Sequence, residues 1–504
     1  MFMFALLLFV TIVWLKPGSK KHIPFPPGPP ADPLIGHLRI IPSNNQETFF
    51  YELGKKYGDI IYLNILGRSI VVLNSARAAV DLLEKRSSNY SDRVDFPIYK
   101  LAGYTKSLVF MKYGKDFQFH RRMFQQYFSK NGCIPYRPLQ ACEAHVLVQN
   151  LVSQPEHKEN HFLHFATALI MRITYGHRIT TNDDPYLRIA ESINFAASNC
   201  GPPGGTPVDV FPILRYFPSW FPGAYYAGFA RSQKALVARQ HEFPYTEVEK
   251  HIEKGAALPS FVAENIEMMR REGVEGPQRI QHIQGAAATI YTAGAETTSS
   301  TLSFFCLALV LHPNSQLKAQ AEIDEIVGSE RLPEMSDRPS LPYLECLLQE
   351  TLRLMDASST SIPHRSLADD IYNGMFIPKG SIVIANTRAI TLDERVYSNP
   401  HVFNPTRFLA KPQGLGEPHP VGPFGFGRRI CPGRHFADDS LWIAMATILA
   451  TLSISRATDS EGGEIIPDVR VETGITSHPK PFPCDIKFRT SRWASLITQR
   501  VNSY

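Results

Sequence analysis

The pattern of apolar and polar positions divides the chain into short β-type segments and much longer helical ones. Residues 59–74 (DIIYLNILGRSIVVLN) place two β-branched runs around a glycine-containing turn and predict a β-hairpin. Apolar positions then recur at helical spacing, for example over residues 75–86 and 137–152. Short strands and turns return over residues 371–386 and 464–489. We therefore expect a mainly α-helical protein with small β-sheets.

One segment, residues 285–311, is long, largely apolar and free of proline. A transmembrane helix is one interpretation of such a run. However, Glu296 lies in its middle beside several hydroxyl residues. An unpaired acid at the centre of a bilayer costs about 2.5–3.5 kcal/mol on insertion scales. We therefore predict a buried central helix with a polar, functional break.

The N-terminus carries a candidate membrane anchor. Residues 1–15 (MFMFALLLFVTIVWL) have no charge and are followed by a lysine-rich stretch. A signal peptide is the alternative, but it requires a positive start and a small-residue cleavage site. The lysines favour a cytosolic position for the following chain. We expect an anchor at 1–15, a basic and proline-rich hinge at 16–40, and one catalytic domain at 41–504.

Composition excludes several classes of protein. The net charge is only +5, from 52 Lys and Arg against 47 Asp and Glu, and no dense basic tract is present. The sequence therefore gives no case for nucleic-acid binding. The seven cysteines are widely spaced and form no Cys-x-x-Cys pair. This pattern favours a reducing compartment over a disulfide-stabilised fold.

One of these cysteines lies in a glycine-rich loop. Residues 424–433 read FGFGRRICPG, and Pro432 is expected in the first turn of a following helix. Cys431 would then lie at a helix N-terminus, where free N–H groups and the helix dipole favour a thiolate. A buried structural cysteine is the simpler alternative. A cysteine nucleophile is a further one, but no nearby His–carboxylate arrangement supports it.

This loop resembles the haem-binding loop of the cytochrome P-450 superfamily, Phe-x-x-Gly-x-Arg-x-Cys-x-Gly, at all five fixed positions. The resemblance implies that Cys431 is the thiolate axial ligand of the iron in haem b, and that Phe424, Arg429 and Gly433 also belong to the cofactor site. It further implies the single-domain P-450 fold, with haem between the long central helix and the cysteine loop.

Two charged motifs resemble further elements of the same family. Glu350 and Arg353, in the sequence ETLR, share one helical face at i, i+3 spacing. Alone, such a pair is more often solvated than functional. FNPTRF (403–408) resembles the family segment that supplies a third charge, Arg407. The resemblance implies a buried ionic cluster of these three residues that serves the fold and haem retention.

The predicted central helix contains AGAETT, residues 293–298. A mid-helix glycine and threonines that bond back to carbonyls are expected to loosen the helical ladder. By resemblance, Glu296 and Thr297 are the acid–alcohol pair that delivers protons during oxygen activation. A polar patch in the core and a helix cap are the alternatives.

Weaker matches concern the haem propionates. YGKDFQFHRRMF (113–124) resembles the family helix with Trp-x-x-x-Arg, in which Arg121 matches and Phe117 replaces the tryptophan. The resemblance implies that Arg121, His364 and Arg429 contact propionates. For each of them singly, a surface basic residue is the alternative.

Together the motifs imply a haem-dependent monooxygenase that inserts one oxygen atom of dioxygen into an apolar small molecule. An endoplasmic-reticulum membrane location and a separate NADPH-dependent flavoprotein reductase are implied as well, with Arg428 and Arg434 as part of a basic docking face. The aromatic segment 210–229 is expected either to roof an access channel near lipid or to pack in the core.

In detail the sequence resembles fungal microsomal members, including the O-methylsterigmatocystin oxidoreductase-like group. This likeness suggests secondary metabolism or xenobiotic oxidation. A reductase-independent haem-thiolate isomerase or peroxygenase is the first alternative function. A non-catalytic haem-binding protein is the second.

Overall fold

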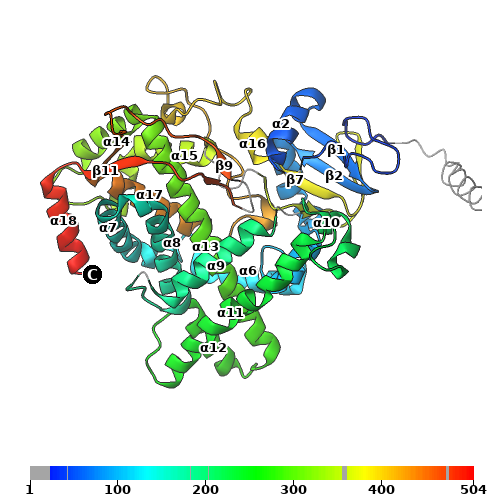
Figure 1. Ribbon diagram of the computed structural model, residues 1–504, viewed down its shortest axis with the longest axis horizontal. Coiled ribbons are helices and arrows are strands. Elements are labelled where there is room, and N and C mark those ends of the chain that lie inside the picture. The colour runs from blue at the N-terminus through cyan, green and yellow to red at the C-terminus, as the bar shows by residue number, and fades with distance from the viewer. Residues whose placement is uncertain (1–22, 43, 182, 202–203, 355–359, 473–475) are drawn as a thin grey trace, which may run out of the picture.

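The computed structural model describes residues 23–504 except 43, 182, 202–203, 355–359 and 473–475. The predicted anchor and the first part of the predicted hinge lie outside the described residues. The described chain is mainly helical with small sheets (Figure 1), so the predicted fold class is confirmed.

The largest sheet brings distant parts of the chain together in the order β1-β2-β7-β4-β3. β1 (Ile60–Ile65) and β2 (Arg68–Leu73) form the predicted antiparallel hairpin. Its turn places Leu66 and Gly67 at φ values of 50° and 81°, as a two-residue hairpin turn requires. β2 runs parallel to β7 (Ile382–Ala385), and β7 pairs with β4 (His364–Arg365). β3 (Asp92–Arg93) completes the sheet and sets Arg93 opposite His364.

The other strands form three small antiparallel pairs. These are β5 (Asp370–Tyr372) with β6 (Met375–Ile377), β8 (Leu452–Arg456) with β11 (Cys484–Phe488), and β9 (Val471–Glu472) with β10 (His478–Pro479). The strands predicted near residues 371–386 and 464–489 are therefore confirmed.

Helices make up most of the remaining described chain. They are α2 Gln46–Tyr57, α3 Ala76–Ala79, α4 Ser87–Tyr90, α5 Pro97–Ala102, α6 Lys115–Phe128, α7 Arg137–Ser153, α8 Lys158–Tyr175, α9 Pro185–Asn199, α10 Pro207–Val210, α11 Tyr225–Glu253, α12 Phe261–Glu272, α13 Pro277–Leu311, α14 Pro313–Ile326, α15 Pro342–Leu354, α16 Thr387–Thr391, α17 Arg434–Thr451 and α18 Ser491–Asn502. A π-helical segment, η1 (Val80–Lys85), follows α3 directly. Short 3-10 segments are η2 Tyr104–Lys106, η3 Ile134–Tyr136, η4 Pro155–His157, η5 Pro212–Tyr216, η6 Met335–Ser340, η7 Pro405–Phe408 and η8 Gly427–Arg429.

The long helix α13 passes through the centre of the molecule (Figure 1) and packs against α6, α8, α11 and α17. It is long and apolar enough to cross a membrane, but 83% of its most apolar window is buried inside the protein. The expected break at residues 293–298 is wrong, because α13 is continuous there. Gly294 instead permits close packing, since a Cβ at this position would clash with the side chain of Ile170 on α8.

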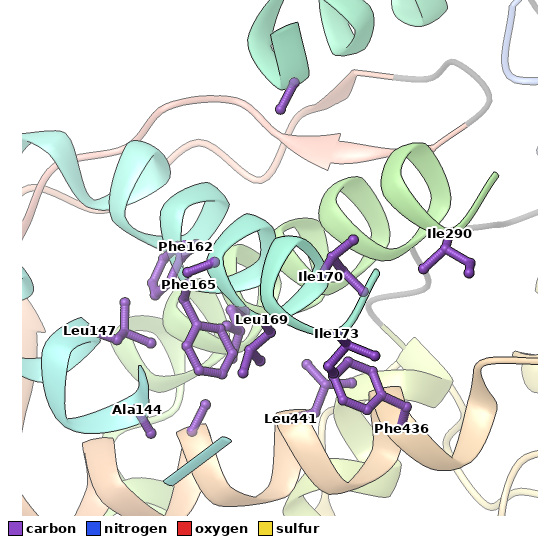
Figure 2. Packing of buried hydrophobic residues seen from close by; sticks show 14 of the residues in the cluster. Ala144, Leu147, Phe162, Phe165, Leu169, Ile170, Ile173, Ile290, Phe436 and Leu441 are labelled. Atoms are coloured by element: carbon purple, nitrogen blue, oxygen red, sulfur yellow. The ribbon is translucent and has the colours of Figure 1, made fainter. Parts of the chain in front are cut away.

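The core beside α13 is built from large side chains of α8. Figure 2 shows Phe165, Leu169 and Ile173 on the side of α8 that faces α7 and α17. Phe436 and Leu441 of α17 contribute to the same buried cluster. This packing fixes α17, and with it the loop that precedes α17, relative to α13.

A buried histidine pair links α6 to α13. The Nε2 atom of His120 lies 3.0 Å from Nδ1 of His282. Burial, followed by the neighbouring His282, lowers the pKa of His120 to about 4. His120 is therefore neutral in the folded protein at pH 7, although an unfolded chain protonates it near pH 6.5.

We predict that this pair makes the fold acid-sensitive. Between about pH 6.5 and pH 4 the unfolded chain binds a proton at His120 that the folded chain does not, so stability falls as the pH is lowered through this window. The free energy of unfolding falls by up to about 3 kcal/mol, since each pKa unit of difference corresponds to about 1.4 kcal/mol. Urea unfolding of the haem-loaded protein at several pH values should show a smaller loss in His120→Gln. The exposed His157→Gln is the control, and an identical pH slope in His120→Gln and wild type would contradict the assignment.

Candidate haem site

The loop around Cys431 is held by backbone contacts. The Cys431 N–H donates to the carbonyl of Phe424 at 2.8 Å. Gly427 has a φ of 55°, and a Cβ there would clash with the backbone carbonyl of Leu83 in η1. Only glycine fits both the conformation and the close approach. The helix that follows begins at Arg434, so the expectation that Pro432 lies in its first turn is wrong.

The electrostatics of Cys431 differ from the expectation that a helix terminus favours the thiolate. Burial is the largest effect and raises the pKa of the thiol. The N–H of Gly433 and the charges of Arg121 and Arg434 lower this pKa, but they do not offset burial. The protein alone therefore favours the neutral thiol, and a metal cation bound to the sulfur would stabilise the thiolate.

Two arginines from the predicted set hold this loop in place, Arg429 within it and Arg121 on α6. Arg429 donates to the carbonyls of Ser91, Leu108 and Met111, at 2.7, 3.3 and 2.7 Å. Its guanidinium also lies 3.7 Å from the ring centroid of Phe117, the residue that replaces the family's tryptophan. Arg121 of α6 donates to the carbonyl of Ile430 at 2.7 Å.

A third arginine at the site, Arg93, was not predicted from the sequence. It is buried in β3 and donates to the carbonyls of Ile362 and Pro363 at 2.5 and 3.1 Å. His364 lies opposite on β4 and contacts the carbonyl of Tyr90 through Nδ1 at 2.7 Å. Burial and the charge of Arg93 lower the pKa of His364 well below its usual value.

These basic groups require an acidic partner. Burial lowers the pKa of Arg429 to about 9, and burial followed by the charge of Arg429 lowers the pKa of Arg93. Among the described residues, no carboxylate lies within ion-pair distance of Arg93, Arg121 or Arg429; the charge of Asp92 raises the pKa of Arg93 and Arg429 but does not offset burial. Buried cations without counter-charges cost several kcal/mol each. Two carboxylates beside a thiol ligand match this arrangement, so the site fits haem b with its two propionates.

Glu350, Arg353 and Arg407 lie in one buried cluster. Arg353 holds both oxygens of Glu350, at 2.7 and 2.9 Å, and Arg407 lies 3.1 Å from Oε1. All three side chains are at most 1% exposed. Arg407 also pairs with Glu417 at 2.6 Å, a partner that sequence reasoning missed. Each charge in this cluster is therefore matched within the protein, unlike the charges beside Cys431.

On α13, Glu296 and Thr297 line a cavity of about 180 Å³. The hydroxyl of Thr297 donates to the carbonyl of Ala293 at 2.8 Å, and its side chain is exposed to the cavity. Glu296 is buried, and its Oε1 lies 3.6 Å from Nε2 of the half-buried His478 on β10. The acid therefore has a neighbour close to the surface, whereas the alcohol faces the space where a substrate can bind. Sequence reasoning did not find His478.

Comparisons with known proteins agree with this geometry. The family model described as Cytochrome P450 matches residues 26–483. A cytochrome P450 monooxygenase of Armillaria gallica is 37% identical over 494 residues, covering 97% of both chains. Cytochrome P450 monooxygenase 176 of Postia placenta is also 37% identical, over 99% of this chain and 96% of its own. A relative from Coprinopsis cinerea is 35% identical, over 95% of this chain and 94% of its own.

The chain belongs to the cytochrome P450 family. It is a haem-thiolate monooxygenase, an oxidoreductase that incorporates oxygen from dioxygen. The matched residues include the cysteine loop, α13 and the buried ionic cluster. The part of the chain that resembles the family is therefore the part that forms the candidate haem site.

We predict that Glu350→Gln destabilises the fold by about 3–5 kcal/mol, because it leaves two buried arginines with insufficient counter-charge. Urea unfolding of the haem-loaded protein measures this loss. Glu464→Gln is the matched control, since Glu464 is 64% exposed in its pair with Arg456 and should cost less than about 1 kcal/mol. Equal losses in both variants would contradict the cluster's assigned role.

We also predict that Arg93→Gln loses haem faster than wild type, because one buried counter-charge for a propionate is removed. Transfer of haem to an excess of an apo-haemoprotein acceptor measures the rate, and an increase of about tenfold or more is expected for a lost charge-assisted bond. Arg365→Gln on the neighbouring strand is the control, because Arg365 is 39% exposed. An unchanged rate of haem transfer from Arg93→Gln would contradict the role of Arg93 in holding a propionate.

Proposed function

We propose that this enzyme hydroxylates apolar small molecules taken from a membrane, with electrons from an NADPH-dependent flavoprotein reductase. The observation that carries the proposal is the division of the site into two faces. One face is a largely apolar cavity that contains Thr297 and Glu296. The other is a basic surface beside the cysteine loop.

Each residue has a defined task in this proposal. Haem, when bound to Cys431, supplies a redox-active iron that activates dioxygen. Thr297 donates its own proton to the carbonyl of Ala293 and presents its hydroxyl oxygen as an acceptor at the cavity surface. Glu296 passes protons from the side of His478. Val109, Phe110 and Ile362 line the same cavity, where they exclude water and hold an apolar substrate.

The opposite face suits an acidic electron donor. A second hollow, of about 240 Å³, is lined by basic side chains that include Arg121, Lys130, Arg434 and His435. Arg428 is exposed in the cysteine loop and contacts the hydroxyl of Tyr113. The positive charge of this hollow, which reaches Pro432 next to Cys431, supports docking of an acidic flavoprotein domain.

The aromatic segment 210–229 supports a membrane location. Ile213, Tyr216 and Trp220 are 61%, 70% and 80% exposed, so core packing does not account for them. An exposed group of large apolar side chains is typical of a membrane or protein contact. With the predicted N-terminal anchor, it supports a catalytic domain on the cytosolic face of the endoplasmic reticulum. The finer likeness to O-methylsterigmatocystin oxidoreductase-like enzymes stays a prediction.

The test combines spectroscopy with oxygen labelling. The reduced protein with carbon monoxide should give the Soret band typical of a thiolate-ligated haem, and Cys431→Ser should lack it. In vesicles with reductase, NADPH and oxygen-18 gas, an apolar probe should gain one labelled oxygen atom. Glu296→Gln should reduce this product by roughly 10²-fold, as loss of a general acid predicts.

Vesicles without reductase are the control and should form no product. Product formation there, with peroxide as the oxidant, would favour a peroxygenase instead. A product whose new oxygen atom is unlabelled would exclude the monooxygenase route.

A further inference from the structure

The cavity beside α13 contains buried polar atoms that the protein leaves unpaired. Tyr104 of η2, and Gln240 and His241 of α11, line it together with Glu296 and Thr297. Within the described chain, the Oη of Tyr104, Oε1 of Gln240 and Nε2 of His241 have no hydrogen-bond partner. Tyr104 is 6% exposed, Gln240 is fully buried and His241 is half-buried, but the three polar atoms themselves are all shielded from bulk solvent. Buried polar atoms are nearly always paired, and three in one cavity indicate a polar ligand group.

The orientation of Gln240 follows from its neighbour. The hydroxyl of Thr292 donates its single proton to the carbonyl of Ala288 at 3.1 Å. This hydroxyl can therefore only accept from the side-chain amide of Gln240, which lies 2.6 Å away. The NH₂ group of Gln240 must face Thr292, which leaves Oε1 as a free acceptor.

His241 presents a second acceptor. Its Nδ1 lies 2.7 Å from the carbonyl of Val237, and a carbonyl only accepts, so Nδ1 carries the proton. Burial lowers the pKa of His241, which keeps the ring neutral and leaves a lone pair on Nε2. Burial also raises the pKa of Tyr104, so its hydroxyl stays protonated and can donate.

The two acceptors, on Gln240 and His241, and the one donor, on Tyr104, determine which polar group of a ligand can bind here. A hydroxyl group on the ligand can donate to Gln240 or His241 and accept from Tyr104. A ketone can only accept from Tyr104, and a carboxylate would face two lone pairs. The described lining contains no lysine or arginine that could neutralise an anion. An ammonium group would need a counter-ion, but Glu296 already lies beside His478.

We propose that the substrate is an apolar molecule with a neutral hydroxyl group, which Gln240, His241 and Tyr104 bind at the α11 end of the cavity. This inference rests on the proposed function and assigns its substrate class. Thr292, which holds Gln240, precedes Thr297 by five residues, or about 7–8 Å along α13. The hydroxyl therefore anchors the molecule about one and a half helical turns from the carbon that reacts.

The test is equilibrium binding of three matched probes to the haem-loaded enzyme. Adamantanol can donate and accept, adamantanone can only accept, and adamantane can do neither. Titration of the haem Soret band, checked by calorimetry, should show that wild type binds the alcohol about tenfold more tightly than the ketone, as expected for one satisfied buried hydrogen bond. The double variant Gln240→Met/His241→Phe should lose this preference. Tyr104→Phe should instead lose the preference for ketone over hydrocarbon.

Ile362→Val is the matched control, because it changes the apolar wall of the same cavity and should alter all three affinities by one common factor. Equal binding of alcohol and ketone to wild type would overturn the proposal. So would an alcohol preference that survives in the double variant, since ordered water would then satisfy these atoms. The carbon monoxide spectrum and oxygen labelling of the same preparations report separately on the proposed function.

Discussion

The organisation of this protein depends on how buried positive charge is neutralised. Around Glu350 the chain supplies its own carboxylates, and Arg353 and Arg407 are matched within the core. Beside Cys431 it supplies arginines and a histidine but pairs none of these arginines with a described carboxylate. Bound haem would supply the missing charge through its propionates, and its iron would stabilise the thiolate of Cys431. The cofactor is therefore part of the electrostatic balance of the fold, as well as the centre of its chemistry.

The helix α13 provides the second organising element. Hydroxyl side chains on this helix, such as those of Thr292 and Thr297, donate hydrogen bonds to backbone carbonyls one turn earlier. Polar residues can therefore line the cavity while the helix remains continuous. A continuous helix keeps fixed spacing between the groups that bind a substrate and the groups that move protons. Precise spacing of this kind is what positions one carbon of a molecule for reaction.

Much of this architecture could be predicted from local sequence. The hairpin, α13 and the cysteine loop each depend on residues close together in the chain, and the family motifs identify the cofactor. Arg93 could not be found in this way, because two of its three carbonyl partners lie 269 and 270 residues further along. Gln240 and His241 resemble ordinary polar positions on an amphipathic helix until α11 packs against α13. The break expected in α13 was wrong because tertiary packing of Gly294 against Ile170 overrides its weak helix propensity.

The contacts of Arg429 have a consequence for how the enzyme matures. This side chain fixes the carbonyls of Leu108 and Met111, and the N–H of Leu108 donates to Thr289 of α13. The segment that carries Tyr104 is thus secured on one side by an arginine that needs the propionates. Without haem, Arg429 would lack the propionates as counter-charge, and its contacts would hold the segment that carries Tyr104 less firmly. Cofactor insertion would therefore strengthen both the haem site and this wall of the substrate cavity.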